Sequence, residues 1–444
     1  MPDHEGEGNY MFPEGFLWGS ATSASQIEGG TVKNEWYDIH RQGKMADGVD
    51  PAESANFWKF YEKDVALMKQ MNHKTFRMSI EWARVEPEEG RFDEAAIAHY
   101  RKIIQAVRDA GILPVVDLHH HSNPLWLYGH GAWANQKAIG YLSRFAKKVV
   151  GSLGDLVTVW LTVNEPTIWA AGAYLVGELP PYKKSLRLFL KSMNHFAEAH
   201  VALYHTINEV HARKNWEKPT IGFANDVHGI DPYGRKNIPD RIGAKLIQKI
   251  FEERFLEKVL KREQTIDIMG INYYFCLLVK FPFKFRVRTD LPMSKEGWPI
   301  DPEGFHRVLK FTWEKYKIPI WVMENGIGED DDELRPRYLL DHIYQMHRAI
   351  SEGVDIRAYY YWATIDTLEY HKGFSIKYGL VGIDFDHKEK TRSLRESGRM
   401  YGEIAAANGI TDEIVERYVP GWTPESFPEG YSRKYMRVGM GELF

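Results

Sequence analysis

Two glutamates of the chain each follow an apolar, strand-like run. Residues 157–166 (VTVWLTVNEP) are rich in β-branched, aromatic and leucine side chains and end in Asn164-Glu165-Pro166, a composition typical of a strand buried on both faces. Residues 319–325 (PIWVMEN) repeat the arrangement and end in Glu324 and Asn325. A carboxylate at the end of an apolar run is costly unless that end opens into a cleft. The pattern predicts two carboxylates that face one another across a pocket.

Paired carboxylates flanking a cleft are what glycosidic bond cleavage requires, because one donates a proton while the other attacks or activates water. A single strand-end glutamate would instead suggest a salt bridge with a neighbouring cation. The chain also has aromatic residues whose faces could pack against the C–H face of a sugar. They are Trp169, Trp298, Trp362 and Tyr370. The combination favours a sugar-cleaving site over structural ion pairs.

Eight apolar or β-branched runs recur along the chain, with helical patterns between them. They cover residues 16–22, 74–80, 113–120, 157–165, 220–226, 266–274, 319–325 and 356–366. Polar and aromatic residues gather at the ends of these runs and not at their starts. Eight strand–helix units in sequence predict a single-domain α/β protein with a (β/α)₈ TIM barrel and decorated βα loops, whose chemistry lies at the carboxyl ends of the strands.

The helical patterns carry their own boundary signals. Asp93 is a plausible N-cap, residues 97, 100, 104 and 107 place apolar side chains on one face, and Gly111 ends the pattern. We expect one catalytic barrel over residues 10–410. Residues 411–444, which include Trp422, Phe427, Tyr431 and Tyr435, are expected to form an extension that packs on the barrel or at a subunit contact, because so many exposed aromatics would aggregate.

Residues 280–299 stand outside the barrel pattern. Phenylalanines alternate there with lysines and arginines, which predicts an amphipathic, strand-like edge. A solvated hairpin beside the pocket is the favoured interpretation, and a membrane-touching or partner-binding surface is the alternative.

Other kinds of site have weaker support. His119, His120 and His121 invite a metal hypothesis, but neighbouring strand side chains point to opposite faces, so His119 and His120 should not both face inward. The chain has no cysteine cluster, no GxGxxG after a strand and no GxxxxGK[ST]. We therefore expect no metal, no nucleotide and no cofactor, and we expect one histidine to bind a sugar hydroxyl.

Composition bounds the setting of the protein. The formal net charge of −4 argues against nucleic acid as a partner. A single cysteine, Cys276, excludes an intramolecular disulfide and fits a reducing compartment. No signal peptide is recognisable at the start, and no apolar run approaches the roughly 20 residues that cross a bilayer. The sequence predicts a cytoplasmic protein without a membrane partner, and it leaves a homo-oligomer open.

The blocks FLWGSATSASQIEG, FRMSIEWARVEP, LHHHSNPLW, LTVNEP, GINYY, VMENG and YYYWATIDTLEYHKGFSIKYGL together resemble the signature blocks of glycoside hydrolase family 1. This family contains β-glucosidases, β-galactosidases and related retaining enzymes. The resemblance covers about residues 10–410 in the expected order, and the paired NEP and ENG blocks make it specific.

The resemblance implies double displacement with Glu165 as acid/base and Glu324 as nucleophile. It implies that Gln26, His120, Asn164, Trp362 and Glu369 hold the sugar, with Asn164 at its 2-hydroxyl. It also implies that Arg77 and Tyr274 keep the nucleophile ionised and oriented, while Asn272 lines the site. Retention requires carboxyl groups about 5–5.5 Å apart, against about 6.5–9.5 Å for inversion. Partial burial near the other anion should raise the pKa of Glu165.

Two positions depart from the family pattern. His121 stands where a bulky aromatic is usual, and Tyr370 stands where tryptophan is usual. Both border the expected sugar site, so the choice among gluco, galacto, fuco and manno substrates stays open. Family members that take 6-phosphoglycosides tend to carry a small hydroxyl residue where this chain has Glu369. A carboxylate there would repel a phosphate dianion, which predicts unphosphorylated substrates.

The leading interpretation is an exo-acting retaining β-glycosidase, most simply a β-glucosidase with some β-galactosidase or β-fucosidase activity. Its partners would be small-molecule β-glycosides or oligosaccharides. A transglycosylase using the same intermediate is the alternative within catalysis. A non-catalytic carbohydrate-binding barrel is a third reading, which the presence of both carboxylates disfavours.

Overall fold

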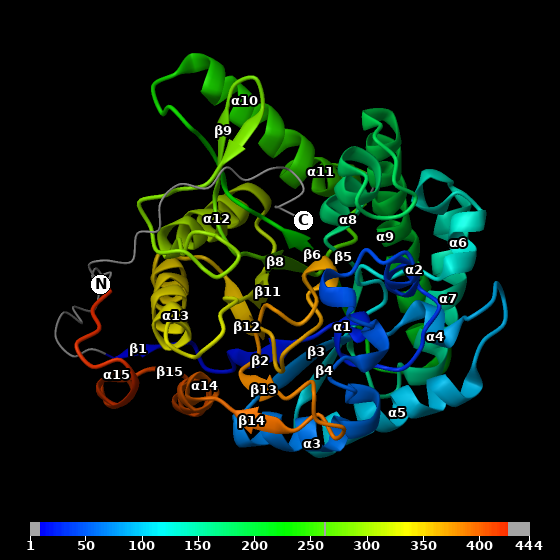
Figure 1. Ribbon diagram of the computed structural model, residues 1–444, viewed down its shortest axis with the longest axis horizontal. Helices are drawn as coiled ribbons and strands as arrows, with labels where there is room; N and C mark the ends of the chain where they lie inside the picture. The colour runs from blue at the N-terminus through cyan, green and yellow to red at the C-terminus, as the bar shows by residue number, and fades with distance from the viewer. Residues whose placement is uncertain (1–8, 262, 425–444) are drawn as a thin grey trace.

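Eight parallel strands close into a barrel at the centre of the protein (Figure 1). The structure is a computed structural model that describes residues 9–261 and 263–424. The strands are β2 (Leu17–Ala21), β3 (Thr75–Ser79), β4 (Leu113–Asp117), β5 (Val159–Asn164), β6 (Thr220–Asp226), β8 (Ile268–Asn272), β11 (Ile320–Asn325) and β12 (Ile356–Trp362). β12 pairs with β2 and closes the ring. The predicted fold class is confirmed, and each strand lies within its predicted run.

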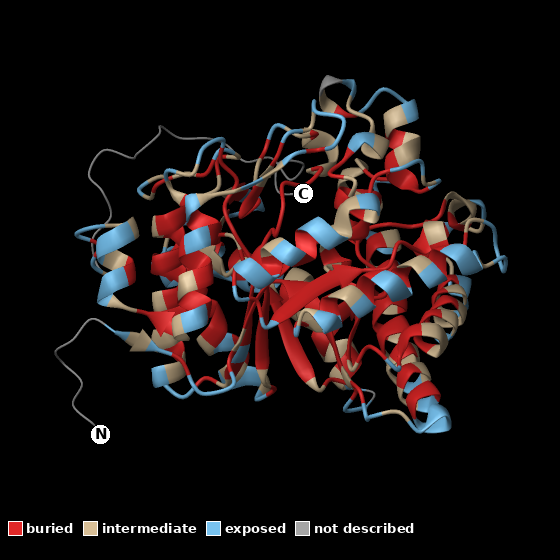
Figure 2. Ribbon diagram, turned by 90° about the horizontal axis from the view of Figure 1, so that it is seen from below, coloured by how far each residue is buried: buried red, intermediate tan, exposed pale blue. Residues whose placement is uncertain are grey.

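The barrel strands are apolar because both of their faces are covered. Every residue of β3, β5, β8 and β11 is buried. One cluster, which includes Val115, Leu161, Met323 and Tyr360, fills the barrel interior. A second cluster lies between the strands and the helices outside them. Figure 2 shows the buried strands at the centre and helices that are buried on their inner sides.

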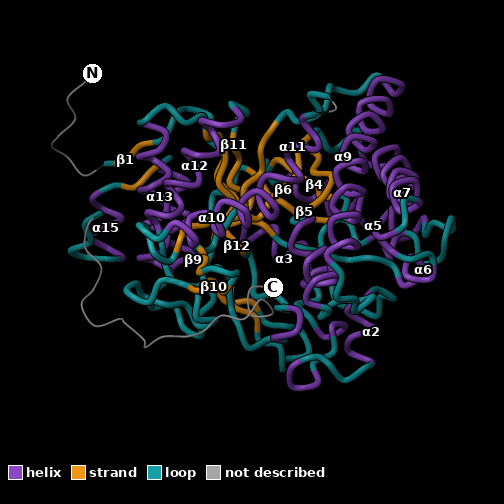
Figure 3. Tube along the Cα trace, turned by 90° about the horizontal axis from the view of Figure 1, so that it is seen from above, coloured by secondary structure: helices purple, strands orange, loops and turns teal. Residues whose placement is uncertain are grey.

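Eight helices follow the eight strands in turn and surround the barrel (Figure 3). They are α3 (Phe57–Gln70), α5 (Glu94–Asp109), α7 (Lys137–Leu153), α9 (Leu186–Lys214), α11 (Arg254–Leu260), α12 (Pro302–Tyr316), α13 (Arg335–Ser351) and α14 (Glu396–Ala407). The side chain of Asp93 accepts the backbone N–H of Ala96 and caps α5, as predicted. Gly111 has a φ of +78° just beyond its end.

Short elements decorate both ends of the barrel. At the end that carries the βα loops, β7 (Ile230–Pro232), β9 (Leu277–Lys280) and β10 (Lys284–Arg286) form a small sheet under α10 (Ile238–Gln248). This unit projects beyond the barrel (Figure 1). The hairpin predicted for residues 280–299 overlaps only in part with the antiparallel pair of β9 and β10, because β9 begins earlier, at Leu277. Elsewhere, β13 (Val381–Ile383) pairs with β14 (Arg392–Leu394).

The two ends of the described chain meet on one side of the barrel. β1 (Tyr10–Met11) pairs with β15 (Gly409–Ile410), and α15 (Asp412–Tyr418) follows. Trp422 is buried, and its indole N–H donates to Asp341 Oδ1 at 2.7 Å. The other aromatics named for the predicted extension, Phe427, Tyr431 and Tyr435, lie outside the described residues. Within residues 9–261 and 263–424, no helix combines the length and apolar character needed to cross a bilayer.

Candidate active site

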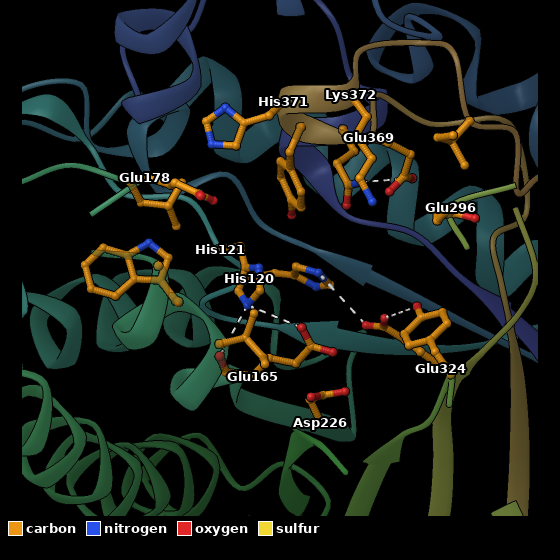
Figure 4. A pocket seen from close by; sticks show the side chains of 18 of the residues that line it. His120, His121, Glu165, Glu178, Asp226, Glu296, Glu324, Glu369, His371 and Lys372 are labelled. Atoms are coloured by element: carbon orange, nitrogen blue, oxygen red, sulfur yellow. Dashed lines mark hydrogen bonds and ion pairs between the residues drawn. The ribbon is translucent and has the colours of Figure 1, made fainter. Parts of the chain in front are cut away.

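A cavity of about 750 Å³ opens at the carboxyl ends of the barrel strands. Glu165 and Glu324, from β strands that are not neighbours in the ring, both line it, and Figure 4 shows their carboxyl groups in this one cavity. Of the other predicted sugar-site residues, Gln26, His120, His121, Trp362, Glu369 and Tyr370 line the same cavity, together with Tyr274. The aromatic residues Trp169 and Trp298 also line it.

Glu165 follows directly after β5 and stands at the N-terminus of α8 (Pro166–Ala171). The Asn272 amide donates to its Oε1 at 2.7 Å, and Nε2 of His121 lies 3.5 Å from its Oε2. Burial raises the pKa of Glu165 well above its ordinary value, and the charges of Glu324 and Asp226 raise that pKa further. The direction of this pKa shift agrees with the expectation from the sequence. The surroundings of Glu165 therefore favour its protonated form.

Glu324 lies near the end of β11 in a different environment. Nη1 of Arg77 donates to Glu324 Oε1 at 2.6 Å, and the Tyr274 hydroxyl donates to Oε2 at 2.7 Å. Each carboxylate oxygen thus has one fixed donor. Gly326 follows two residues later, and a Cβ there would lie 1.9 Å from the carbonyl oxygen of Trp362. Only glycine permits this close approach of the ends of β11 and β12.

Arg77 is fully buried below the cavity and links several of the predicted residues. Its Nη2 donates to Asp117 Oδ2 at 2.6 Å and to Asn164 Oδ1 at 2.7 Å. Burial alone would lower the pKa of Arg77, but the charges of Asp117 and Glu324 outweigh it and raise that pKa. The guanidinium is thus a permanent cation shared by two carboxylates.

His120 and Asn164 extend the same network. Nδ1 of His120 donates to Asp117 Oδ2 at 3.1 Å, which leaves Nε2 to accept the Asn164 amide at 3.1 Å. Asn164 Oδ1 also accepts from the Asn272 amide at 3.1 Å. Asn164, Asn272 and Arg77 lie beneath the cavity and not among the residues that line it. The contact of Asn164 with a sugar 2-hydroxyl stays a prediction.

A second carboxylate group lies at the far side of the cavity. The Gln26 amide donates to Glu369 Oε1 at 3.3 Å and to the Leu368 carbonyl at 2.8 Å. The pKa of Glu369 is raised to about 7, mainly by burial. The hydrogen bond from the Thr367 hydroxyl lowers this pKa in part, and the charge of Glu296 raises it further. Figure 4 shows Glu369 and Glu296 on the same side of the cavity. The Trp362 ring stacks with the His120 ring at a centroid distance of 5.8 Å.

His119 and His120 face in different directions, as the sequence predicts, while His121 lines the cavity beside His120. His119 faces the core, where its Nε2 contacts Asn123 Oδ1 at 3.0 Å, whereas His120 lines the cavity. Among the described residues, no group of three or more histidine, cysteine or acidic side chains could hold a metal ion. Burial, reinforced by the charges of His120 and His119, lowers the pKa of His121 well below its ordinary value. His121 thus presents a neutral imidazole to Glu165.

Four non-glycine residues that line the cavity have a left-handed backbone conformation, namely His121 (φ +47°), Glu165 (φ +43°), Tyr182 (φ +55°) and Tyr370 (φ +45°). This conformation costs about 1–3 kcal/mol for a residue with a side chain. It turns the chain sharply just after β5 and in the loops after β4 and β12. The Tyr370 ring stacks on Trp36 at a centroid distance of 4.1 Å. Both departures from the family pattern therefore sit at strained loop positions.

Several cavity residues are absent from the sequence-based prediction. They are Trp36 of the short helix α2 (Glu35–Arg41), and Glu178, Glu296, Lys372 and Tyr378 from the segments that connect the main elements. Asp117, below the cavity, anchors both Arg77 and His120. Asp117 does have a signal in the sequence, since it is a charged residue within the third apolar run, residues 113–120. The loop residues have no such periodic signal.

Removing the guanidinium should destabilise the protein. In an Arg77→Met variant, Asp117 and Glu324 would lose their shared cation, so we expect the free energy of unfolding to fall by about 3–5 kcal/mol. Urea unfolding followed by tryptophan fluorescence measures this. The control is Arg101→Met, which breaks the solvent-exposed pair with Asp155 and should cost less than about 1 kcal/mol. Equal losses in the two variants would contradict the structural role of Arg77.

Comparison with known proteins identifies the class. The chain matches the model of glycosyl hydrolase family 1 over residues 9–265 and 257–410, and it belongs to this family. It is therefore a glycoside hydrolase. It is 28% identical to beta-glucosidase A of Thermotoga maritima over 444 residues, covering 90% of this chain and 99% of that protein.

Two further similarities concern a solved structure and a transferase. The structure of a beta-glycosidase from Pyrococcus horikoshii is 31% identical with a TM-score of 0.83, covering 92% of this chain and 98% of that one. A galactolipid galactosyltransferase of Arabidopsis thaliana is 31% identical over 377 residues, covering 80% of this chain and 58% of that protein.

Proposed function

We propose that the protein is a retaining exo-β-glycosidase that removes terminal β-linked sugars, with β-glucosides as its main substrates and β-galactosides and β-fucosides as further ones. The observation that carries the proposal is the pair of unlike carboxyl groups in one cavity. Glu165 has a raised pKa, whereas Glu324 accepts hydrogen bonds from Arg77 and Tyr274. One group suits a proton donor and the other a nucleophile. The reaction needs no cofactor.

In the first step, Glu324 attacks the anomeric carbon and forms an ester bond while the bond to the leaving group breaks. Glu165 gives its proton to the departing oxygen. In the second step, Glu165, now ionised, takes a proton from water, and the water oxygen attacks the anomeric carbon and releases Glu324. Two inversions give net retention, which requires the carboxyl groups to be about 5–5.5 Å apart.

Gln26, His120, Trp362 and Glu369 are proposed to hold the terminal sugar, and Asn164 to reach its 2-hydroxyl. The Gln26 amide donates a hydrogen bond to Glu369, so the two side chains present donor and acceptor groups with a fixed geometry. His121 and Tyr370 are proposed to border the sugar. Ile168, Trp169 and Phe275 line an apolar part of the cavity, which suits the leaving group or an acceptor.

A panel of nitrophenyl β-glycosides tests the proposal. The β-glucoside should be hydrolysed with the highest kcat/KM, the β-galactoside and β-fucoside with lower values, and the released sugar should be the β-anomer at first. Proton NMR of the fresh product reads its configuration. Initial release of the α-anomer would overturn the retaining mechanism.

Transfer of the sugar to an acceptor is the second candidate, and the galactosyltransferase relative favours it. A transferase would resolve the intermediate with a second sugar in place of water. Product analysis at high substrate concentration separates the two, because transfer yields longer glycosides whereas hydrolysis yields free sugar alone.

The sugar site should reject 6-phosphoglycosides. Glu369 lines the cavity and has a pKa of about 7, so it becomes increasingly anionic as the pH rises through 7 and then repels a phosphate dianion. We expect kcat/KM to be lower for nitrophenyl 6-phospho-β-glucoside than for the unphosphorylated glucoside, and the ratio to widen from pH 6 to pH 8. A Glu369→Gln control should weaken this pH dependence and leave only the part that comes from the second ionisation of the phosphate. A preference for the phosphorylated substrate would contradict the prediction.

We also propose a cytoplasmic location. The one cysteine of the sequence, Cys276, is buried as a free thiol, which fits a reducing compartment.

A further inference from the structure

Exposed apolar side chains are concentrated on the unit formed by α10 and the β7–β9–β10 sheet, residues 230–248 and 277–286, which we call the α10 platform. Nine large hydrophobic side chains are exposed among the described residues, and six of them lie here. These six are Tyr233, Ile238, Ile242, Leu246, Phe281 and Phe283. The platform projects from the end of the barrel that carries the cavity (Figure 1). Such a concentration marks an interaction surface.

The α10 helix is apolar on two faces, and only one of them serves the fold. Gly243, Ala244 and Ile247 are buried, and the helix packs through Gly243 against Val279 of β9. Ile238, Ile242 and Leu246, four residues apart, form a separate exposed stripe. This second stripe makes no contribution to the core, so it is available to a partner.

The β9–β10 hairpin divides its aromatic residues in the same way. Phe285 is buried in the platform, whereas Phe281 and Phe283 at the tip are about half exposed. The hairpin is tied to α10, since Asp240 Oδ1 accepts the backbone N–H of Phe281 at 2.8 Å. The apolar helix stripe and the apolar hairpin tip are thus held on one rigid unit.

The platform is strongly basic although the whole chain carries a net charge of −4. Its exposed cations are Arg235, Lys236, Arg241, Lys245, Lys280 and Lys284. Among the platform residues 230–248 and 277–286 only Asp231 and Asp240 are acidic, and Asp231 pairs with Arg307 outside the platform at 3.0 Å. Asp240 is buried and is occupied by backbone N–H groups, so it does not offset these charges at the surface.

We propose that the α10 platform docks the protein on the surface of an anionic lipid bilayer. Exposed aliphatic and aromatic side chains surrounded by lysine and arginine are what an interfacial helix presents to acidic headgroups. A second copy of this chain fits less well, because two such faces would repel each other. The sequence predicts no membrane partner because no apolar run spans a bilayer, but surface docking needs no such run.

Nucleic acid also fits less well than lipid. Its backbone would accept the cations, but its bases stack on aromatic rings, and the α10 stripe of Ile238, Ile242 and Leu246 is aliphatic. Docking would also bring the cavity to the lipid surface. Two residues that line the cavity lie close in sequence to the platform. Phe275 lies two residues before β9, and His228 lies two residues before β7.

Co-sedimentation with vesicles tests the proposal. The full chain should sediment with vesicles of phosphatidylcholine that contain phosphatidylserine, and at least about tenfold less strongly with pure phosphatidylcholine vesicles. Raising the salt concentration should weaken the binding. A full chain that stays in the supernatant with the anionic vesicles at low salt would overturn the proposal.

Matched variants localise the surface. Phe283→Glu and Ile242→Glu should each weaken vesicle binding at least about tenfold, whereas Met11→Glu should not. Met11 is 47% exposed and Phe283 49%, but Met11 lies on β1, far from α10 (Figure 1). Equal thermal unfolding midpoints would show that the variants stay folded. The proposal would be overturned if the platform variants bound vesicles as strongly as Met11→Glu does. It would also be overturned if the wild type were a dimer, and if the platform variants dissociated that dimer without changing vesicle binding.

Discussion

Replacing Glu324 by alanine should lower kcat for nitrophenyl β-glucoside by at least about 10⁴-fold, because the variant lacks the carboxylate proposed to form the covalent intermediate. Glu324 is the carboxylate that Arg77 and Tyr274 hold in place. Steady-state release of nitrophenol measures the loss. A variant as active as the wild type would leave the proposed mechanism without its nucleophile.

Rescue by azide tests the role of Glu324 in the same variant more directly. Alanine leaves space beside the anomeric carbon on the face from which Glu324 would attack. Azide bound there should restore release of nitrophenol and form the α-glycosyl azide, since a single displacement inverts the anomeric carbon. A β-glycosyl azide from Glu324→Ala would place the two carboxylates in exchanged roles.

Replacing Glu165 by alanine should make the reaction depend on the leaving group. For sugar or alkyl leaving groups, which need protonation, kcat/KM should fall about 10²–10⁴-fold. For dinitrophenyl β-glucoside, whose leaving group is stable as an anion, it should fall less than about tenfold. Azide should then accelerate the second step and give the β-glycosyl azide. An equal loss with both kinds of leaving group would contradict the role of Glu165 as acid.

The pH profile gives an independent check on Glu165. The protonated form is the active one, so kcat/KM falls as the pH rises through the raised pKa, and the Glu165→Gln variant should lack this alkaline decline. The charge of Asp226 contributes to the raised pKa of Glu165. An Asp226→Asn control should therefore move the decline to lower pH. A decline that stays in place in Glu165→Gln would belong to another group.

The barrel was predictable because its strands are buried on both faces and so read as apolar runs of similar spacing. The strand-end rule then placed Glu165, Glu324 and His120 in one cavity without any other information. The helix that starts at Asp93 was predictable for a local reason, because its cap and its apolar face lie within a few residues of each other.

Other parts of the site depend on tertiary contacts that no local pattern records. Asn164 ends an apolar run like Glu165, yet its amide turns below the cavity to meet Arg77 and His120. Glu296 reaches the cavity from a loop after the β9–β10 hairpin. The apolar stripe on α10 was also missed, since its exposed and buried faces are both apolar and the sequence alone does not separate them.

The guanidinium of Arg77 lies between Asp117 and Glu324, so the net charge of these three groups differs between the resting enzyme and the proposed covalent intermediate. In the resting enzyme these three groups sum to one excess negative charge at the floor of the barrel, which attracts an electron-poor anomeric centre. Once Glu324 becomes an ester, Arg77 and Asp117 remain as a neutral couple. In the covalent stage the floor of the barrel therefore carries no excess charge and does not attract the sugar electrostatically. The rate at which the sugar is released then depends on when water or another acceptor arrives.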